Sequence, residues 1–102
     1  MSNSPIQRVV VIQNEQGLHA RPADRFVRLA QQFQSKVEIV RGSDRVQASS
    51  IMDLLTLGAA KGTQLTLEAQ GSDAEQALEA LAQLVEHGFK DEDDEKENKA
   101  AS

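Results

Sequence analysis

The spacing of apolar residues divides the chain into seven predicted elements. Residues 6–13 are rich in β-branched side chains and predict a first strand. Because Val9 to Ile12 are all apolar, the pattern does not show which face of this strand is buried. A turn ending at Gly17 follows. The next apolar residues recur at helical spacing and predict a helix that begins at or just after His19 and extends to about Phe33; they are Ala23, Phe26, Val27, Ala30 and Phe33.

The middle of the chain predicts a hairpin and a short helix. Residues 36–41 alternate between apolar and polar, 42–44 form a turn, and 45–48 form a short third strand. Residues 51–57 follow a pair of serines and precede Gly58, which predicts a helix with a serine N-cap and a glycine stop.

The last two elements have the clearest periodicity. Residues 63–69 alternate, with Leu65, Leu67 and Ala69 on one side, and predict a half-buried fourth strand. Ser72 and Glu75 then have the spacing of a capping box, and Gly88 ends the final helix. Its apolar stripe consists of Ala74, Ala77, Leu78, Leu81, Ala82 and Val85.

The predicted order βαββαβα defines the fold class. Strands with one polar face and amphipathic helices favour a two-layer α+β domain, an antiparallel sheet covered by helices on one side. Periodicity does not give the order of the strands within the sheet.

Composition and charge narrow the possible functions. The 102 residues suffice for one domain and include no cysteine, which excludes disulfides and thiolate chemistry. The start has neither the basic residues nor the long apolar run of a signal peptide, so we expect a cytoplasmic protein without membrane insertion. Residues 90–99 contain six acidic and three basic residues, which leaves residues 1–89 with a net charge of −2 and no basic footprint for nucleic acid.

His19 is the candidate reactive residue. It precedes the first turn of a predicted helix, whose free amides, at Ala20 and Arg21, form a site for a phosphate. The same helix dipole favours a neutral imidazole, which is nucleophilic, and Arg21 is suited to stabilise charge on a phosphoryl oxygen. Pro22 fits the first turn because that turn needs no amide hydrogen there.

Each candidate residue also has a purely structural interpretation. His19 alone could be a surface residue that caps a helix, and Arg21 could be a solvated charge on that helix. Ser50 could serve only as the N-cap of the short helix. The other histidine, His87, lies far along the chain near a helix end, so we expect no metal site, and we expect no cofactor.

The run Gly17-Leu18-His19-Ala20-Arg21-Pro22-Ala23 resembles the active-site motif of the histidine-containing phosphocarrier protein (HPr) family of the bacterial phosphoenolpyruvate-dependent sugar phosphotransferase system. Further matches follow at Ser50-Ile51-Met52, Leu57-Gly58 and Lys61-Gly62, and the resemblance covers residues 6–89. It implies an open-faced two-layer sandwich with sheet order 1-4-2-3 and three helices on one face.

The resemblance also implies the roles of individual residues. His19 would accept a phosphoryl group at Nδ1 from enzyme I, charged by phosphoenolpyruvate, and pass it to EIIA-type domains. Ala20 and Arg21 would hold the phosphate. Ser50 would be the regulatory site of an HPr serine kinase/phosphorylase, with Ser49 beside it as an alternative. The partner interface would include Ile51, Met52 and Leu55, and we expect a monomer.

The chain departs from the family pattern in two places. Asp24 and Arg25 stand where small or apolar residues are common, which affects partner preference and leaves the chemistry intact. We expect residues 1–89 to form the phosphocarrier domain and the acidic residues 90–102 to be a disordered tail or a frayed helical extension.

Two rival functions remain open at this stage. One is a purely regulatory phosphoprotein that uses His19 and Ser50 without sugar transport. The other is a binding module without phosphoryl chemistry, which the intact motif disfavours. A hydrolase is the least supported, because one histidine lacks the accompanying base, orienting group and nucleophile.

Overall fold

The computed structural model describes residues 4–89 and contains the seven predicted elements in the predicted order. They are β1 (Ile6–Val11), α1 (Ala20–Ala30), β2 (Lys36–Arg41), β3 (Asp44–Gln47), α2 (Ile51–Thr56), β4 (Gln64–Gln70) and α3 (Ala74–Glu86). The hairpin, the short helix and the final amphipathic helix are therefore confirmed.

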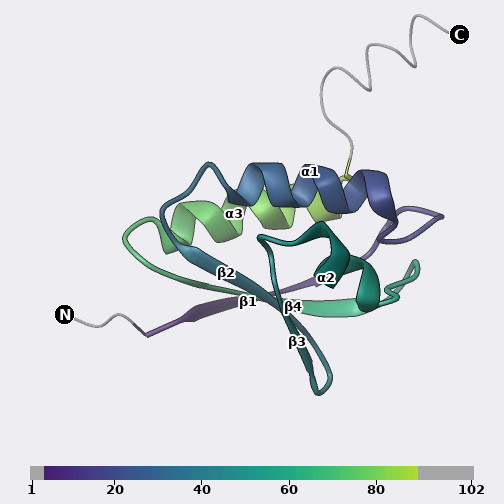
Figure 1. Cartoon of the computed structure of the whole chain (residues 1–102), viewed down its shortest axis with the longest axis horizontal. Coiled ribbons are helices and arrows are strands. Elements are labelled where there is room, and N and C mark those ends of the chain that lie inside the picture. Colours follow the sequence, from purple (N-terminus) through teal and green to yellow (C-terminus); the bar gives the residue numbers. More distant parts are fainter. Residues whose placement is uncertain (1–3, 90–102) are drawn as a thin grey trace, which may run out of the picture.

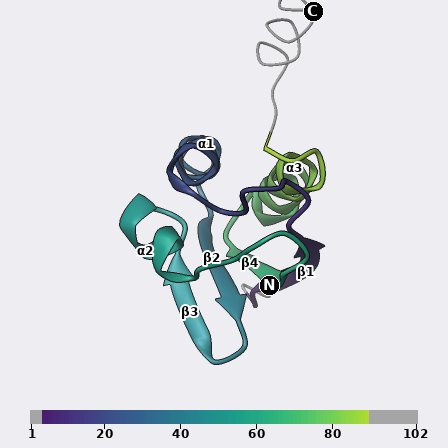
Figure 2. The same cartoon turned by 90° about the vertical axis from the view of Figure 1, so that its right-hand side faces the viewer.

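The four strands form one antiparallel sheet in the order β1-β4-β2-β3. The three helices lie on one face of this sheet, with α1 and α3 side by side and α2 beside the β2–β3 end, as Figure 1 and the end-on view of Figure 2 show. The other face is open. This is the α+β open-faced sandwich with order 1-4-2-3 that the resemblance implied.

The core lies between the sheet and the helices. The alternating residues of β4 point into it, since Leu65, Leu67 and Ala69 are each 2% exposed or less. The whole apolar stripe predicted for α3 is buried as well. The ambiguous facing of β1 is resolved in favour of Val10, which is buried, while its neighbour Val9 is 53% exposed on the open face.

Several predicted boundaries were wrong by one to three residues. The first strand ends at Val11, the last residue that pairs with β4, although Ile12 still forms main-chain hydrogen bonds with Thr63 and Gly62 just before β4. The helix predicted to extend to Phe33 ends at Ala30, where amides begin to bond three residues back, as from Gln32 to Leu29. The remaining shifts affect β3, α2 and β4, predicted at 45–48, 51–57 and 63–69.

The predicted capping box of α3 is also wrong. The N-cap is Asp73 rather than Ser72, and its side chain makes no cap hydrogen bond. The Asp73 carboxylate instead accepts hydrogen bonds from the amide of Gln34 at 2.8 Å, the amide of Ser35 at 3.0 Å and the hydroxyl of Ser35 at 2.6 Å. A tertiary contact has replaced the local cap.

The acidic tail predicted over 90–102 lies outside the described residues. Within residues 4–89, none of the helices has the length and apolar character needed to span a bilayer.

Candidate functional site

His19 is the N-cap of α1, as predicted. Its backbone is extended, with φ −98° and ψ −169°, and its carbonyl accepts the first helical hydrogen bond from the amide of Ala23 at 2.9 Å. The side chain is half-buried and makes no cap hydrogen bond with the helix. The imidazole therefore stands at the helix start without a capping duty.

The first turn of α1 is open to an anion. Pro22 has no amide hydrogen, and the first turn contains no acidic residue. Among residues 4–89, no group accepts a hydrogen bond from the amides of Ala20 or Arg21. These two exposed residues thus provide free donors at the positive end of an 11-residue helix.

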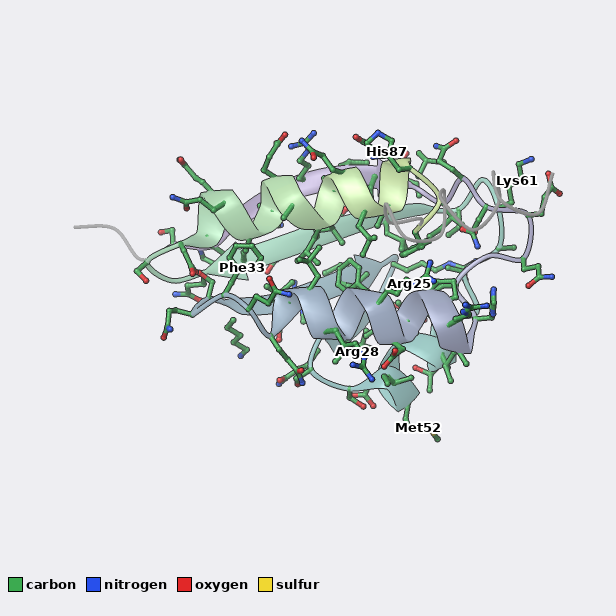
Figure 3. The ribbon with its side chains drawn as sticks, turned by 90° about the horizontal axis from the view of Figure 1, so that it is seen from above. Arg25, Arg28, Phe33, Met52, Lys61 and His87 are labelled. Atoms are coloured by element: carbon green, nitrogen blue, oxygen red, sulfur yellow. The ribbon has the colours of Figure 1, made fainter. Side chains whose placement is uncertain are left out.

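Arg21 is the basic side chain of α1 that is left available. Arg28 pairs with Asp24 at 2.9 Å, one turn earlier on the helix. Arg25 donates to the carbonyl of Phe89 at 2.6 Å, and Figure 3 shows it on the side of α1 that faces α3. Arg21 is exposed and has no ion pair or hydrogen bond within the described part of the chain. Its guanidinium is free to meet a ligand.

The loop before His19 is fixed by main-chain contacts. The amide of Leu18 donates to the carbonyl of Ala59 at 2.8 Å, and the amide of His19 donates to the carbonyl of Gly17 at 3.0 Å. Gly17 has φ +72°, and a Cβ on it would lie 2.4 Å from the Ala59 oxygen. Only glycine fits this position, for both conformational and steric reasons.

An ion pair joins the same two loops at the surface. The Lys61 ammonium binds the Glu15 carboxylate, and this hydrogen bond and charge hold the pKa of Glu15 below its ordinary value. Figure 3 shows Lys61 at the end of the molecule where these loops meet. Both side chains are exposed, so the pair adds little to stability.

The short helix α2 carries the second candidate position. Ser50 is its N-cap and accepts a hydrogen bond from the amide of Asp53 at 3.2 Å, so the predicted cap belongs to Ser50 and not to Ser49. Met52 is 72% exposed and projects from the ribbon in Figure 3. Ile51 and Leu55 are half-buried against the core. Because α2 packs against α1, this apolar surface belongs to the same side of the domain as α1.

A metal centre has no ligand set here. His87 is exposed at the end of α3, and no group of three or more potential ligands occurs among residues 4–89. The reactive candidates are confined to the start of α1 and to α2.

The sequence over residues 6–87 matches the family model described as PTS HPr component phosphorylation site. The chain belongs to the HPr family. It is 40% identical over 84 residues to the phosphocarrier protein HPr of Neisseria meningitidis, covering 82% of this chain and 94% of that protein. This membership makes it a relative of the phosphocarriers of the phosphotransferase system.

Solved structures agree with the family and with the fold. The crystal structure of HPr from Thermoanaerobacter tengcongensis has a TM-score of 0.80 at 39% identity and covers 85% of this chain and 98% of that one. The Bacillus subtilis protein Crh, whose crystal structure is described as a swapped, intertwined dimer, has a TM-score of 0.68 at 41% identity, with 84% and 99% covered. The HPr family thus includes a chain that assembles in pairs.

One residue of this HPr-family site was not predicted from the sequence. Asn14 contacts the His19 loop through its side chain, donating to the carbonyl of Gly17 at 2.6 Å. Sequence reasoning read Asn14 only as part of a turn. The signal available was an asparagine within a turn, because asparagine side chains often form hydrogen bonds with nearby main-chain groups.

Proposed function

We propose that this HPr-family protein is a phosphocarrier that accepts a phosphoryl group on His19. In the accepting step, the lone pair of Nδ1 attacks the phosphorus of the phosphoryl group that enzyme I carries. A new N–P bond forms as the bond between phosphorus and enzyme I breaks, and the enzyme I group leaves with the electron pair. Enzyme I has itself been charged by phosphoenolpyruvate. Transfer to an EIIA-type domain repeats this exchange.

The observation that carries the proposal is the start of α1. A histidine without a capping duty stands beside two free amides and an unpaired arginine, all within three consecutive residues. Amides at a helix start bind phosphate oxygens, and the Arg21 guanidinium offsets the negative charge of the transferring group. The site needs neither a metal nor a cofactor for this exchange.

Ser50 is the proposed regulatory position. Phosphate on an N-cap serine adds nearly two negative charges, which the helix dipole accommodates, but it places them next to the exposed Met52. An acidic partner would then be repelled. The proposed modifying partner is an HPr serine kinase/phosphorylase.

The proposed docking surface combines the start of α1 with the outward side of α2. Met52 is its exposed apolar residue, and the half-buried Ile51 and Leu55 flank it. A methionine side chain adapts to different partner surfaces, as suits a carrier that must meet both a donor and an acceptor.

The proposal also covers the domain bounds, the oligomeric state and the location of the protein in the cell. Residues 1–89 form the phosphocarrier domain, and 90–102 are an acidic extension of it. We propose that the protein works as a monomer in the cytoplasm, since His19 and Arg21 come from one chain and the sequence contains no cysteine. Light scattering in solution tests the monomer against a paired form of the kind described for Crh.

A purely regulatory phosphoprotein is the second candidate. The observation in its favour is the capping position of Ser50, which offers a modification site independent of His19. It differs from the first proposal in the recipient, because phosphate on His19 would then report metabolic state without reaching a sugar transporter.

Incubation with enzyme I and phosphoenolpyruvate, followed by intact-mass analysis, tests the carrier chemistry. We expect the wild type to gain one phosphoryl group that is labile in acid and stable in alkali, and we expect His19→Ala to gain none. Adding EIIA-type domains should then discharge the wild type. The matched control is His87→Ala, which removes the exposed histidine at the end of α3 and should still be phosphorylated.

Two outcomes of this experiment would contradict the proposal. A folded wild type that stays unphosphorylated by an enzyme I active on another carrier would refute the proposal. Phosphorylation that persists in His19→Ala would move the reactive residue elsewhere.

A further inference from the structure

The carbonyl of Gly17 lies at the centre of the loop that leads into His19. It accepts two hydrogen bonds, one from the side-chain amide of Asn14 at 2.6 Å and one from the main-chain amide of His19 at 3.0 Å. The amide of Gly17 in turn donates to the carbonyl of Asn14 at 3.1 Å. Asn14 thus closes the turn from both sides, and its side chain reaches the peptide that orients His19.

The orientation of the Asn14 amide follows from this geometry. If the amide were turned over, Oδ1 would face the carbonyl oxygen of Gly17, and two acceptors would repel each other. With Nδ2 on Gly17, Oδ1 is buried and has no hydrogen-bond partner among residues 4–89. A buried acceptor without a partner costs free energy, and this cost offsets part of what the hydrogen bond to Gly17 contributes.

Asn14 also contacts a second element. A Cβ built on Gly88 would lie 3.8 Å from the Cβ of Asn14, so the chain that follows α3 packs beside this side chain. On the other side, Gly17 rests against Ala59 and Ala60. The turn is therefore enclosed between two segments, and its hydrogen bonds have little freedom to change.

We propose that Asn14 is a positioning residue for phosphoryl transfer at His19, acting through the carbonyl of Gly17. Its Nδ2 fixes the peptide plane that the His19 amide also binds, and this sets the direction in which the imidazole leaves the backbone relative to the free amides of Ala20 and Arg21. This inference rests on the proposed carrier function.

The test replaces Asn14 by leucine and by aspartate and measures phosphorylation of the full chain by enzyme I and phosphoenolpyruvate over a range of carrier concentrations. Asn14→Leu removes the donor and the unpaired acceptor together, while Asn14→Asp keeps the shape but replaces the donor by a negatively charged carboxylate oxygen that the Gly17 carbonyl repels. We expect kcat to fall about tenfold in both variants with little change in KM, because misplacing a reacting group by a fraction of an ångström slows the chemical step.

A stability measurement separates positioning from folding. We expect the urea midpoint of Asn14→Leu to lie close to that of the wild type, since the variant loses the hydrogen bond to Gly17 and the unpaired oxygen together. The matched control is Glu15→Gln, which changes the next residue of the same turn and breaks its ion pair with Lys61. It should leave kcat unchanged. An unchanged kcat in both Asn14 variants, or a loss that only follows the fraction of unfolded protein, would overturn the inference.

A second readout does not depend on the carrier function. Nitrogen-15 NMR of the unphosphorylated protein should show the His19 main-chain amide and ring nitrogens shifted in Asn14→Leu and unshifted in Glu15→Gln. If the wild type takes no phosphate but these shifts appear, the proposed function fails while the positioning role stands. If His19 signals are the same in all three proteins, the positioning role fails on its own.

Discussion

The carboxylate of Asp73 accepts two hydrogen bonds from Ser35, one from its hydroxyl at 2.6 Å and one from its amide at 3.0 Å. This contact joins the first residue before α3 to the loop that enters β2, 38 positions earlier in the chain. Gly71 lies so close that a Cβ on it would be 2.7 Å from the Cα of Ser35. At the end of the domain opposite to His19, this contact joins the segment before β2 to the segment before α3.

The first prediction concerns acid stability. The hydroxyl of Ser35 and then the amide of Gln34 hold the pKa of Asp73 below its ordinary value. Its stabilising effect is therefore fully present above the unfolded-state pKa of aspartate, about 3.9, and disappears as pH falls through the lower folded pKa. We expect Asp73→Asn to lower the urea midpoint at neutral pH and to match the wild type in strong acid. A gap that stayed constant with pH would contradict this.

The second prediction concerns Arg21. Removing a group that stabilises a developing anion slows transfer by about 10²- to 10³-fold when the site is enclosed, and by less at an exposed position. We expect Arg21→Ala to slow phosphorylation of His19 about tenfold to a hundredfold, in rapid-quench assays, without a change in melting temperature. Arg28→Ala, which loses a residue paired with Asp24, is the control and should change the rate much less.

The third prediction separates the cap from the charge at Ser50. Loss of an N-cap hydrogen bond costs about 0.5–2 kcal/mol, so Ser50→Ala should lower the free energy of unfolding by that amount. Ser50→Asp keeps an acceptor for the Asp53 amide and should restore most of it, while its negative charge raises KM for enzyme I. The exposed Ser49 makes no cap, so Ser49→Ala should alter neither quantity. Equal KM values for Ser50→Asp and wild type would contradict the charge argument.

The fourth prediction compares the two large hydrophobic side chains that are exposed within residues 4–89, Met52 and Val9. They lie on different elements, Met52 on α2 and Val9 on β1. We expect Met52→Gln to raise KM for enzyme I several-fold and Val9→Thr to leave it unchanged. Both exposed substitutions should alter stability by no more than about 0.5 kcal/mol. A larger KM effect from Val9 would move the docking surface to the open face of the sheet.

The fifth prediction uses two glycines with the same sign of φ. Gly42 has φ +58° and open space around it, whereas Gly17 has φ +72° and the Ala59 oxygen in the way. Alanine at Gly42 should cost about 1–2 kcal/mol, the price of a left-handed residue. Gly17→Ala should cost more, because the Ala59 loop must also move, and it should slow phosphorylation. Equal losses of stability would show that the close approach to Ala59 is unimportant.

Local patterns were sufficient to predict the elements. The alternation through Leu65 and Leu67 and the helical stripe of α3 depend only on which side of each element meets the core, and both were confirmed. Element ends were less accurate, since the last turn of α1 depends on tertiary packing. The sheet order came from the resemblance, because periodicity shows which face is buried and says nothing of which strands are neighbours.

Contacts between distant residues escaped the sequence analysis. Ser72 and Glu75 have the spacing of a capping box, yet Asp73 is the N-cap, and its carboxylate binds Ser35 and Gln34 instead of the helix amides. Asn14 was missed for a different reason. Its contact with Gly17 is local, but an asparagine in a turn has several main-chain groups within reach, and the sequence does not show which of them it binds.

Main-chain hydrogen bonds on both sides of His19 hold this residue in place. The amide of Leu18 is fixed by the carbonyl of Ala59, and the His19 carbonyl is fixed by the amide of Ala23. The outward side chains at Asp24 and Met52 take no part in these bonds. Substitutions at Asp24 and Met52 can therefore change the surface that a partner meets while the main-chain bonds around His19 stay the same. We therefore expect that chains with this scaffold share one placement of the histidine and differ in the partners that they bind.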